Sequence, residues 1–135
     1  METVTDYVVD TMALAKHLDD TLPPRPARIF REAEGGDGHL LLPEIALAEF
    51  VHLSLKGRIP GVQSETSIRE VIHNLRASPY LSISAMSPRA WEAFVDLPIP
   101  EMHNRMIAAD ALARRIPVIS NDPVFSMIEH LRVVW

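Results

Sequence analysis

The sequence predicts an α/β fold with a central parallel β-sheet and α-helices on both sides. Short apolar runs, typical of strands buried on both faces, alternate along the chain with amphipathic helical patterns. Two of these runs lead directly into an aspartate, Asp10 or Asp122, and each aspartate is followed at once by a new helical pattern. Strand, acidic turn and helix form the repeating unit of a parallel sheet, in which ligands bind beyond the carboxyl ends of the strands.

Composition restricts the class of protein. The 135 residues are 47% hydrophobic and 23% charged, which predicts one globular domain over residues 1–135. No apolar run is long enough to span a membrane, and acidic residues near the N-terminus argue against a secretory signal, so we expect a cytoplasmic protein. The absence of cysteine excludes disulfides and thiolate metal sites. A net charge of −5 argues against binding nucleic acid through overall charge, but it permits a local basic rim.

The first half of the chain alternates as this fold class requires. Prolines at 23, 24 and 26 and the glycine-rich turn at 35–38 separate its apolar segments, and Gly57 ends the last of them. We expect, in order, a strand at 7–9, a helix from 11, a helix through 29–33, a strand at 40–42 and a helix from 43 to 55.

The second half repeats the alternation. The expected elements are a helix at 66–76, a strand at 80–84, a helix after 87–88, a helix from 103 to 116, a strand at 117–120, a helix through 125–131 and a terminal strand at 133–135. In the helix from 103 the pattern predicts a buried face and leaves three arginines for water: Met106, Ile107, Ala109, Ala113 and Ile116 face inward, and Arg105, Arg114 and Arg115 face outward. We expect Trp91 in the core or in an interface rather than as a base-stacking platform.

Three acids are candidates for chemistry. Asp10 and Asp122 follow buried strands, although each could simply cap the helix that comes after it. Glu49 lies in an apolar helical segment, where an unpaired carboxylate would be costly to desolvate. Either an arginine or a bound cation should therefore accompany Glu49. Clustered carboxylates without nitrogen or sulfur ligands suit Mg²⁺ or Mn²⁺, which can activate a water for attack on a phosphoryl group.

Other polar residues have simpler interpretations. Asp19 and Asp20 are expected at a solvated helix end, and His52 at the surface, although it lies three residues after Glu49. The six histidines include no pair at zinc spacing. Ser120 has no histidine and acid arranged around it in the sequence, so nucleophilic serine chemistry has no support.

Over nearly its whole length the sequence resembles the PIN-domain family, especially the VapC-like toxins of toxin–antitoxin pairs. The resemblance rests on four segments in order: VVDT at 8–11, LPEIALAEF at 42–50, HNRMIAA at 103–109 and PVISND at 117–122. It implies a PIN-like fold and Mg²⁺- or Mn²⁺-dependent hydrolysis of RNA phosphodiester bonds. Asp10, Glu49 and Asp122 fall on the acidic metal-binding positions of the family. The resemblance also implies a small antitoxin protein as partner, and a homodimer.

The sequence departs from the family at Asn104, where an aspartate is usual. The amide can offer an oxygen to a cation or hold a water, so we include Asn104 in the catalytic set, but it adds no charge and should lower metal affinity. Asp110 lies about 120° around a straight helix from Asn104 and cannot simply replace it. Asp110, within the helix, and Glu101, just ahead of it, both stay open as additional contributors to the site.

Two alternatives to the ribonuclease stay open. The first is a PIN-fold binding module that has lost efficient catalysis, with Asn104 as the cause. The second is a phosphotransfer receiver or phosphatase, which would need a suitably placed lysine beside a strand-end aspartate, and Lys16 and Lys56 support it poorly. If RNA is the substrate, Arg105 or Arg58 could position its backbone.

Overall fold

A computed structural model describes residues 6–135; the first five residues, part of the segment that argued against a secretory signal, lie outside the described residues. Within 6–135 the strands form one parallel five-stranded sheet in the order β3-β2-β1-β4-β5. The strands are β1 (Asp6–Val9), β2 (His39–Pro43), β3 (Leu81–Ser84), β4 (Val118–Ile119) and β5 (Val133–Val134). The predicted central parallel sheet is therefore confirmed.

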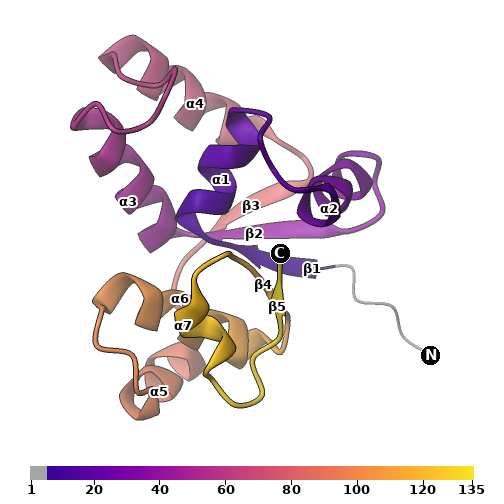
Figure 1. Cartoon of the computed structure of the whole chain (residues 1–135), viewed down its shortest axis with the longest axis vertical. Helices are drawn as coiled ribbons and strands as arrows, with labels where there is room; N and C mark the ends of the chain where they lie inside the picture. The colour runs from indigo at the N-terminus through magenta and orange to yellow at the C-terminus, as the bar shows by residue number, and fades with distance from the viewer. Residues whose placement is uncertain (1–5) are drawn as a thin grey trace.

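Helices cover both faces of this sheet (Figure 1). The first four lie on one side and the last three on the other. They are α1 (Thr11–Leu18), α2 (Pro24–Glu34), α3 (Glu44–Leu55), α4 (Glu65–Ala77), α5 (Pro88–Asp96), α6 (Met102–Arg114) and α7 (Pro123–Ser126). Pro43, which the sequence placed at the start of a helix, instead ends β2, and α3 begins at Glu44.

The core explains why the strand segments are almost entirely apolar. Val8 and Val9 of β1 and Val118 and Ile119 of β4 have no exposed surface, because helices cover both sides of these two neighbouring inner strands. The largest fully buried side chains come from the surrounding helices: Phe30, Phe50 and Phe125. Burying each aromatic side chain stabilises the fold by roughly 2–3 kcal/mol, so the core holds the strand ends in fixed register.

The last predicted helix is wrong in length. Instead of running through 125–131, α7 ends at Ser126, and the Met127 side chain is 82% exposed. Turn hydrogen bonds, such as Leu131 N to Ile128 O at 3.3 Å, bring Ile128 inward without a helix, and His130 takes a left-handed φ of 68°. Phe125 and Ile128 are buried although tight turns replace the rest of the predicted helix.

The face predicted for α6 is also partly wrong. Residues 107–111 are all buried, including Asp110, because α6 packs between β1 and α5. Of the arginines expected in water, Arg105 donates to the carbonyls of Phe94 at 2.7 Å and Val95 at 3.0 Å and stacks on the Phe94 ring. Arg105 therefore fastens α5 to α6, and its guanidinium is not a free group for an RNA backbone.

Trp91 does not lie in the core. Its side chain is 50% exposed on α5 and meets the Phe94 ring edge-on, with 5.7 Å between the ring centroids. Of the two positions predicted for it, only an interface stays open.

Candidate metal centre

The first two acids of the site follow neighbouring parallel strands. Asp10 comes directly after β1, and its backbone N–H donates to Ile119 O of β4 at 3.3 Å. Asp10 Oδ1 accepts from Ala13 N at 2.8 Å, and Asp122 Oδ1 accepts from Val124 N at 3.0 Å. The capping interpretation is thus correct for both acids. One oxygen of each carboxylate still lies beyond these caps, so capping does not preclude a second role.

Ser120 lies between these two acids and positions both. Its side chain is 1% exposed, and its Oγ accepts a hydrogen bond from Asp122 N at 3.0 Å. The same hydroxyl hydrogen-bonds the Asp10 carboxylate. Ser120 therefore fixes the relative orientation of the two strand-end acids, which is a supporting role rather than a nucleophilic one.

Glu49 reaches the site from α3. Thr11, at the start of α1, donates from its hydroxyl to Ala46 O at 3.2 Å, which fixes α3 beside the end of β1. Glu49 follows Ala46 by three residues and so shares its face of the helix. Its side chain is 29% exposed, and one carboxylate oxygen lies 3.1 Å from His103 Nδ1. Among the described side chains the partner of Glu49 is therefore a histidine instead of the suggested arginine, and the suggested cation stays a prediction.

The start of α6 supplies the amide and one more acid. Asn104 Nδ2 donates to Asp122 Oδ2 at 3.1 Å, as it must, because a carboxylate can only accept. Glu101 caps α6 by accepting from the backbone N–H groups of His103 at 2.9 Å and Asn104 at 2.7 Å. Burial acts to raise the pKa of Glu101, but these hydrogen bonds and His103 outweigh it and lower that pKa.

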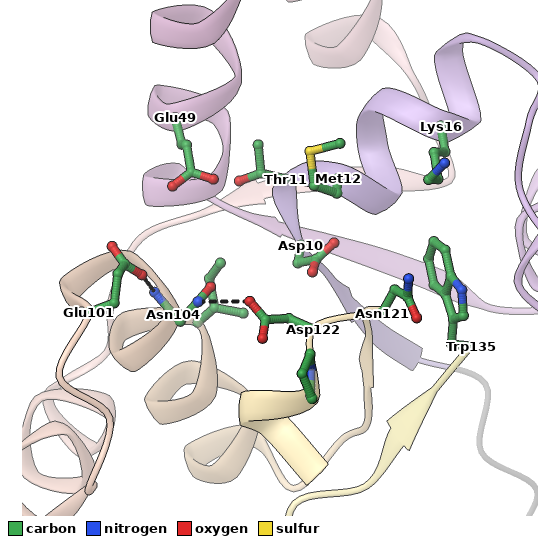
Figure 2. Close-up of a pocket in the computed structure, with 12 residues that line it drawn as sticks. Asp10, Thr11, Met12, Lys16, Glu49, Glu101, Asn104, Asn121, Asp122 and Trp135 are labelled. Atoms are coloured by element: carbon green, nitrogen blue, oxygen red, sulfur yellow. Dashed lines mark hydrogen bonds between the residues drawn. The ribbon is translucent and has the colours of Figure 1, made fainter. Parts of the chain in front are cut away.

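All four predicted site residues line one cavity of about 640 Å³ (Figure 2). Its walls are formed by Asp10, Thr11, Met12, Lys16, Glu49, Glu101, Asn104, Ile107, Asn121, Asp122, Pro123 and Trp135. Asp110 lines a different cavity of about 370 Å³, which it shares with Trp91, so it does not join the site. His52, Asp19 and Asp20 are exposed and are not among the residues of the acidic cavity.

The electrostatics of this cavity favour a cation. Burial is the main cause that raises the pKa of Asp10 to about 6; the nearby charges of Asp122 and Glu49 act in the same direction, and the hydrogen bonds from Ser120 and Ala13 act against it. A carboxylate held near two others at neutral pH is destabilised unless positive charge accompanies it. Carboxylate oxygens are also the ligands that Mg²⁺ and Mn²⁺ prefer, so the residues present fit such an ion.

Comparison with models of known protein families identifies the family of this chain. A model of the PIN domain matches residues 7–131. The chain belongs to the PIN domain family. A search of curated protein sequences finds no match. Within the described residues, no helix of this PIN domain has the length and apolar character needed to cross a membrane.

Solved structures share the fold at low sequence identity. The chain is similar to a structure of VapBC2 from Rickettsia felis bound to a promoter DNA fragment, with 16% identity, coverage of 97% of this chain and 99% of that one, and a TM-score of 0.76. A DNA-bound VapBC structure from Salmonella typhimurium has 15% sequence identity, coverage of 98% of each chain and a TM-score of 0.68. A toxin–antitoxin complex from Klebsiella pneumoniae has 16% sequence identity, coverage of 96% of each chain and a TM-score of 0.64. The match is to the PIN fold, over almost the full length of each chain.

Sequence reasoning missed several residues in the cavity and beside it. Glu49, Glu101 and His103 each offer a ligand atom within 4.8 Å of the other two, yet His103 was dismissed for lacking a histidine partner at zinc spacing. The sequence signal that could have identified His103 was its position two residues after Glu101, at the start of α6. Lys16 and Trp135 gave no local signal, because only the tertiary fold brings them to this cavity.

Proposed function

We propose that this PIN domain is a metal-dependent endoribonuclease that hydrolyses RNA phosphodiester bonds. The observation that carries the proposal is the convergence of Asp10, Glu49 and Asp122, from three separate elements, on one open cavity. Burial is the main cause of the raised pKa of Asp10, and the charges of Asp122 and Glu49 add to it. A PIN domain with such a cluster is suited to binding a divalent cation beside a phosphate.

Each residue has a distinct role in this proposal. Asp10, Glu49 and Asp122 would hold Mg²⁺ or Mn²⁺, and Asn104 would complete the catalytic set through its amide. When bound, the cation supplies Lewis acidity and neutralises charge on the phosphoryl oxygens. Ser120 hydrogen-bonds the Asp10 carboxylate and the backbone N–H of Asp122, and the two helix caps restrain both carboxylates. The chain thereby holds its acids ready in place before RNA binds.

The decisive experiment is RNA cleavage with added Mg²⁺ or Mn²⁺. Asp10→Asn keeps the hydrogen-bond acceptor that caps α1 and removes only the charge, so we expect a loss of about 100-fold or more in rate. Asp110→Asn is a matched control, because Asp110 is an equally buried acid that lines the other cavity. An unchanged rate in Asp10→Asn would show that the proposed chemistry is wrong.

One observation favours the alternative of a weakened binding module. The Asn104 amide already occupies Asp122 Oδ2, an oxygen that the proposed metal site would use. Calorimetric titration of the metal-free protein with Mn²⁺ separates the two functions. Tight binding with cleavage supports the nuclease, whereas binding of RNA without metal uptake or cleavage supports the module.

We further propose a small antitoxin protein as partner, a homodimer, and a cytoplasmic site of action. The similarity in fold to proteins solved as VapBC complexes supports the partner. Large apolar side chains exposed on several helices supply contact surface: Met12, Leu18, Leu55, Trp91, Val95 and Met102. Co-purification of the product of the neighbouring gene with the tagged chain tests the partner, and light scattering tests the dimer.

A further inference from the structure

The acidic cavity has two chemically different ends (Figure 2). Glu49 and Glu101 lie at one end, Asp10 and Asp122 lie in the middle, and Lys16 and Trp135 lie at the other end. The proposed metal chemistry uses the acids and leaves the Lys16 end without a role. An acidic site that must accept a polyanion needs some nearby positive charge, and this end provides it.

Lys16 is the one lysine or arginine among the residues that line the cavity. It extends from α1, six residues after Asp10, and is half-buried. No acid in residues 6–135 forms an ion pair with Lys16, even though four carboxylates line the same cavity. Its ammonium charge is therefore left for an anion from outside the protein, and the anion that a nuclease brings to its cavity is a phosphate.

Trp135 directly follows β5, the strand that pairs with β4. The carboxyl ends of β1, β4 and β5 therefore lie side by side at about 4.8 Å spacing and lead into Asp10, the Asp122 loop and Trp135 in that order. The indole is half-buried, and Figure 2 shows it standing beneath Lys16 with Asn121 between it and Asp122. A flat aromatic ring at a partly open wall is a surface on which an unpaired base can stack.

We propose that Lys16 and Trp135 form a nucleotide subsite, in which Trp135 stacks the base of an unpaired nucleotide adjacent to the scissile phosphate and Lys16 binds a phosphate of the same strand. This inference rests on the proposed ribonuclease function and deepens it by naming the residues that would bind an unpaired nucleotide beside the scissile phosphate. A base inside a duplex keeps its faces covered by neighbouring bases, so it cannot stack on Trp135. The amide of Asn121 lies beside the ring, where it can contact the edge of the stacked base.

The chain offers a matched control for each residue. Its lysines are Lys16 and Lys56, and its two tryptophans are Trp135 and Trp91. Lys56 is exposed at the end of α3, and Trp91 lines the separate cavity, so neither borders the acids. In Trp91→Phe, Trp135 is the sole tryptophan, and its fluorescence reports directly on stacking.

The subsite can be tested by titrating the Trp91→Phe variant with a short unstructured RNA, first in EDTA and then in Mg²⁺. Trp135 fluorescence should be quenched by this RNA and much less by the same strand annealed into a duplex. Trp135→Ala should weaken single-strand binding about fivefold or more, and Trp135→Phe should retain part of the affinity, because a smaller ring still stacks. Lys16→Ala should reduce the salt dependence of log K by about 0.7, the value for one contact to single-stranded phosphate, whereas Lys56→Ala and Trp91→Ala should match the wild type.

Cleavage kinetics separate this subsite from the metal chemistry. Lys16→Ala and Trp135→Ala should raise KM more than they lower kcat, because they contact nucleotide beside the reacting phosphate. Normal cleavage with no quenching of Trp135 in either EDTA or Mg²⁺ overturns the subsite and leaves the nuclease intact. Quenching without any cleavage supports the subsite and refutes the nuclease. Equal quenching by single strand and duplex overturns base stacking on Trp135. The quenching measurement needs no substitution at Trp135 that could disturb folding.

Discussion

Asp10 and Asp110 are both almost fully buried, yet their surroundings differ in one decisive respect. Asp10 is 6% exposed and Asp110 is 1% exposed, and burial raises the pKa of each. Asp110 accepts a hydrogen bond from Arg114 Nε at 3.0 Å, which lowers its pKa in part. The nearest charges that act on Asp10 are the carboxylates of Asp122 and Glu49, which raise its pKa further.

The difference separates an acid whose charge is compensated within the fold from one whose charge is not. A buried carboxylate with its own guanidinium has its charge compensated within the fold. A buried carboxylate whose neighbours are carboxylates costs stability until a cation arrives, and such strain in the free protein is typical of sites built for a ligand. Burial alone therefore does not separate the two aspartates, but the sign of the neighbouring charge does.

The largest expected effect on stability comes from removing the charge of Asp10 in metal-free protein. Its folded pKa of about 6 lies above the ordinary value of 3.8, so the wild type loses stability as the pH rises from about 4 to about 6. Asp10→Asn keeps the cap and should raise the free energy of unfolding at pH 7.5 by up to about 3 kcal/mol, with no gain below pH 4. Urea unfolding in EDTA at several pH values measures this, and a less stable Asn variant at pH 7.5 would contradict the comparison.

Metal should reverse the penalty at Asp10 and leave Asp110 unaffected. At a Mn²⁺ concentration of about 100 times Kd, the wild type should gain about 2.7 kcal/mol in the free energy of unfolding. Asp110→Asn should keep this gain, and Asp10→Asn should lose most of it. Thermal melts of EDTA-treated protein with and without Mn²⁺ provide the measurement. An equal gain in Asp10→Asn would place the ion elsewhere.

Removing the guanidinium of Arg114 should make Asp110 resemble Asp10. Arg114→Met leaves the Asp110 carboxylate, whose Oδ2 already has no hydrogen-bond partner in the described chain, without its main donor. The side chain of Arg114 is 31% exposed, so we expect a moderate loss of about 2 kcal/mol at pH 8. The loss should be smaller at pH 5, because Asp110 then protonates more readily. Denaturant-induced unfolding at both pH values tests this. RNA cleavage, measured at a temperature where the variant stays folded, should be unchanged.

The smallest expected effect on stability comes from Asn104→Asp. This change removes the donor to Asp122 Oδ2 and adds a fifth carboxylate to the cavity, so metal-free protein should lose about 1 kcal/mol at pH 7.5. With metal present the added charge should instead raise Mn²⁺ affinity about tenfold and increase cleavage. Calorimetric titration and single-turnover cleavage measure both effects. If neither affinity nor rate rises, Asn104 does not occupy the fourth position of the site.

Much of the site could be predicted because strand and helix patterns are local. Asp10 and Asp122 follow apolar runs, and a parallel sheet places the carboxyl ends of its strands at one edge. Asp110 was harder to place, since helical periodicity puts it off the predicted inner face, yet α5 covers that face and buries it. Lys16 and Trp135 could not be identified as residues of the cavity, because the order of strands in the sheet does not follow from the sequence of any single segment.

By itself the sequence predicted the α/β class from short-range periodicity, the three candidate acids from their places after buried strands and within an apolar helix, and the PIN family from the resemblance carried by four segments of the chain. Only the tertiary structure decided which charges meet. It gave Asp110 an arginine, gave Asp10 two further carboxylates, and placed Asn104 against Asp122. Electrostatic energy depends on distances between groups that are far apart in the chain, and the packing of helices on both faces of the sheet sets those distances.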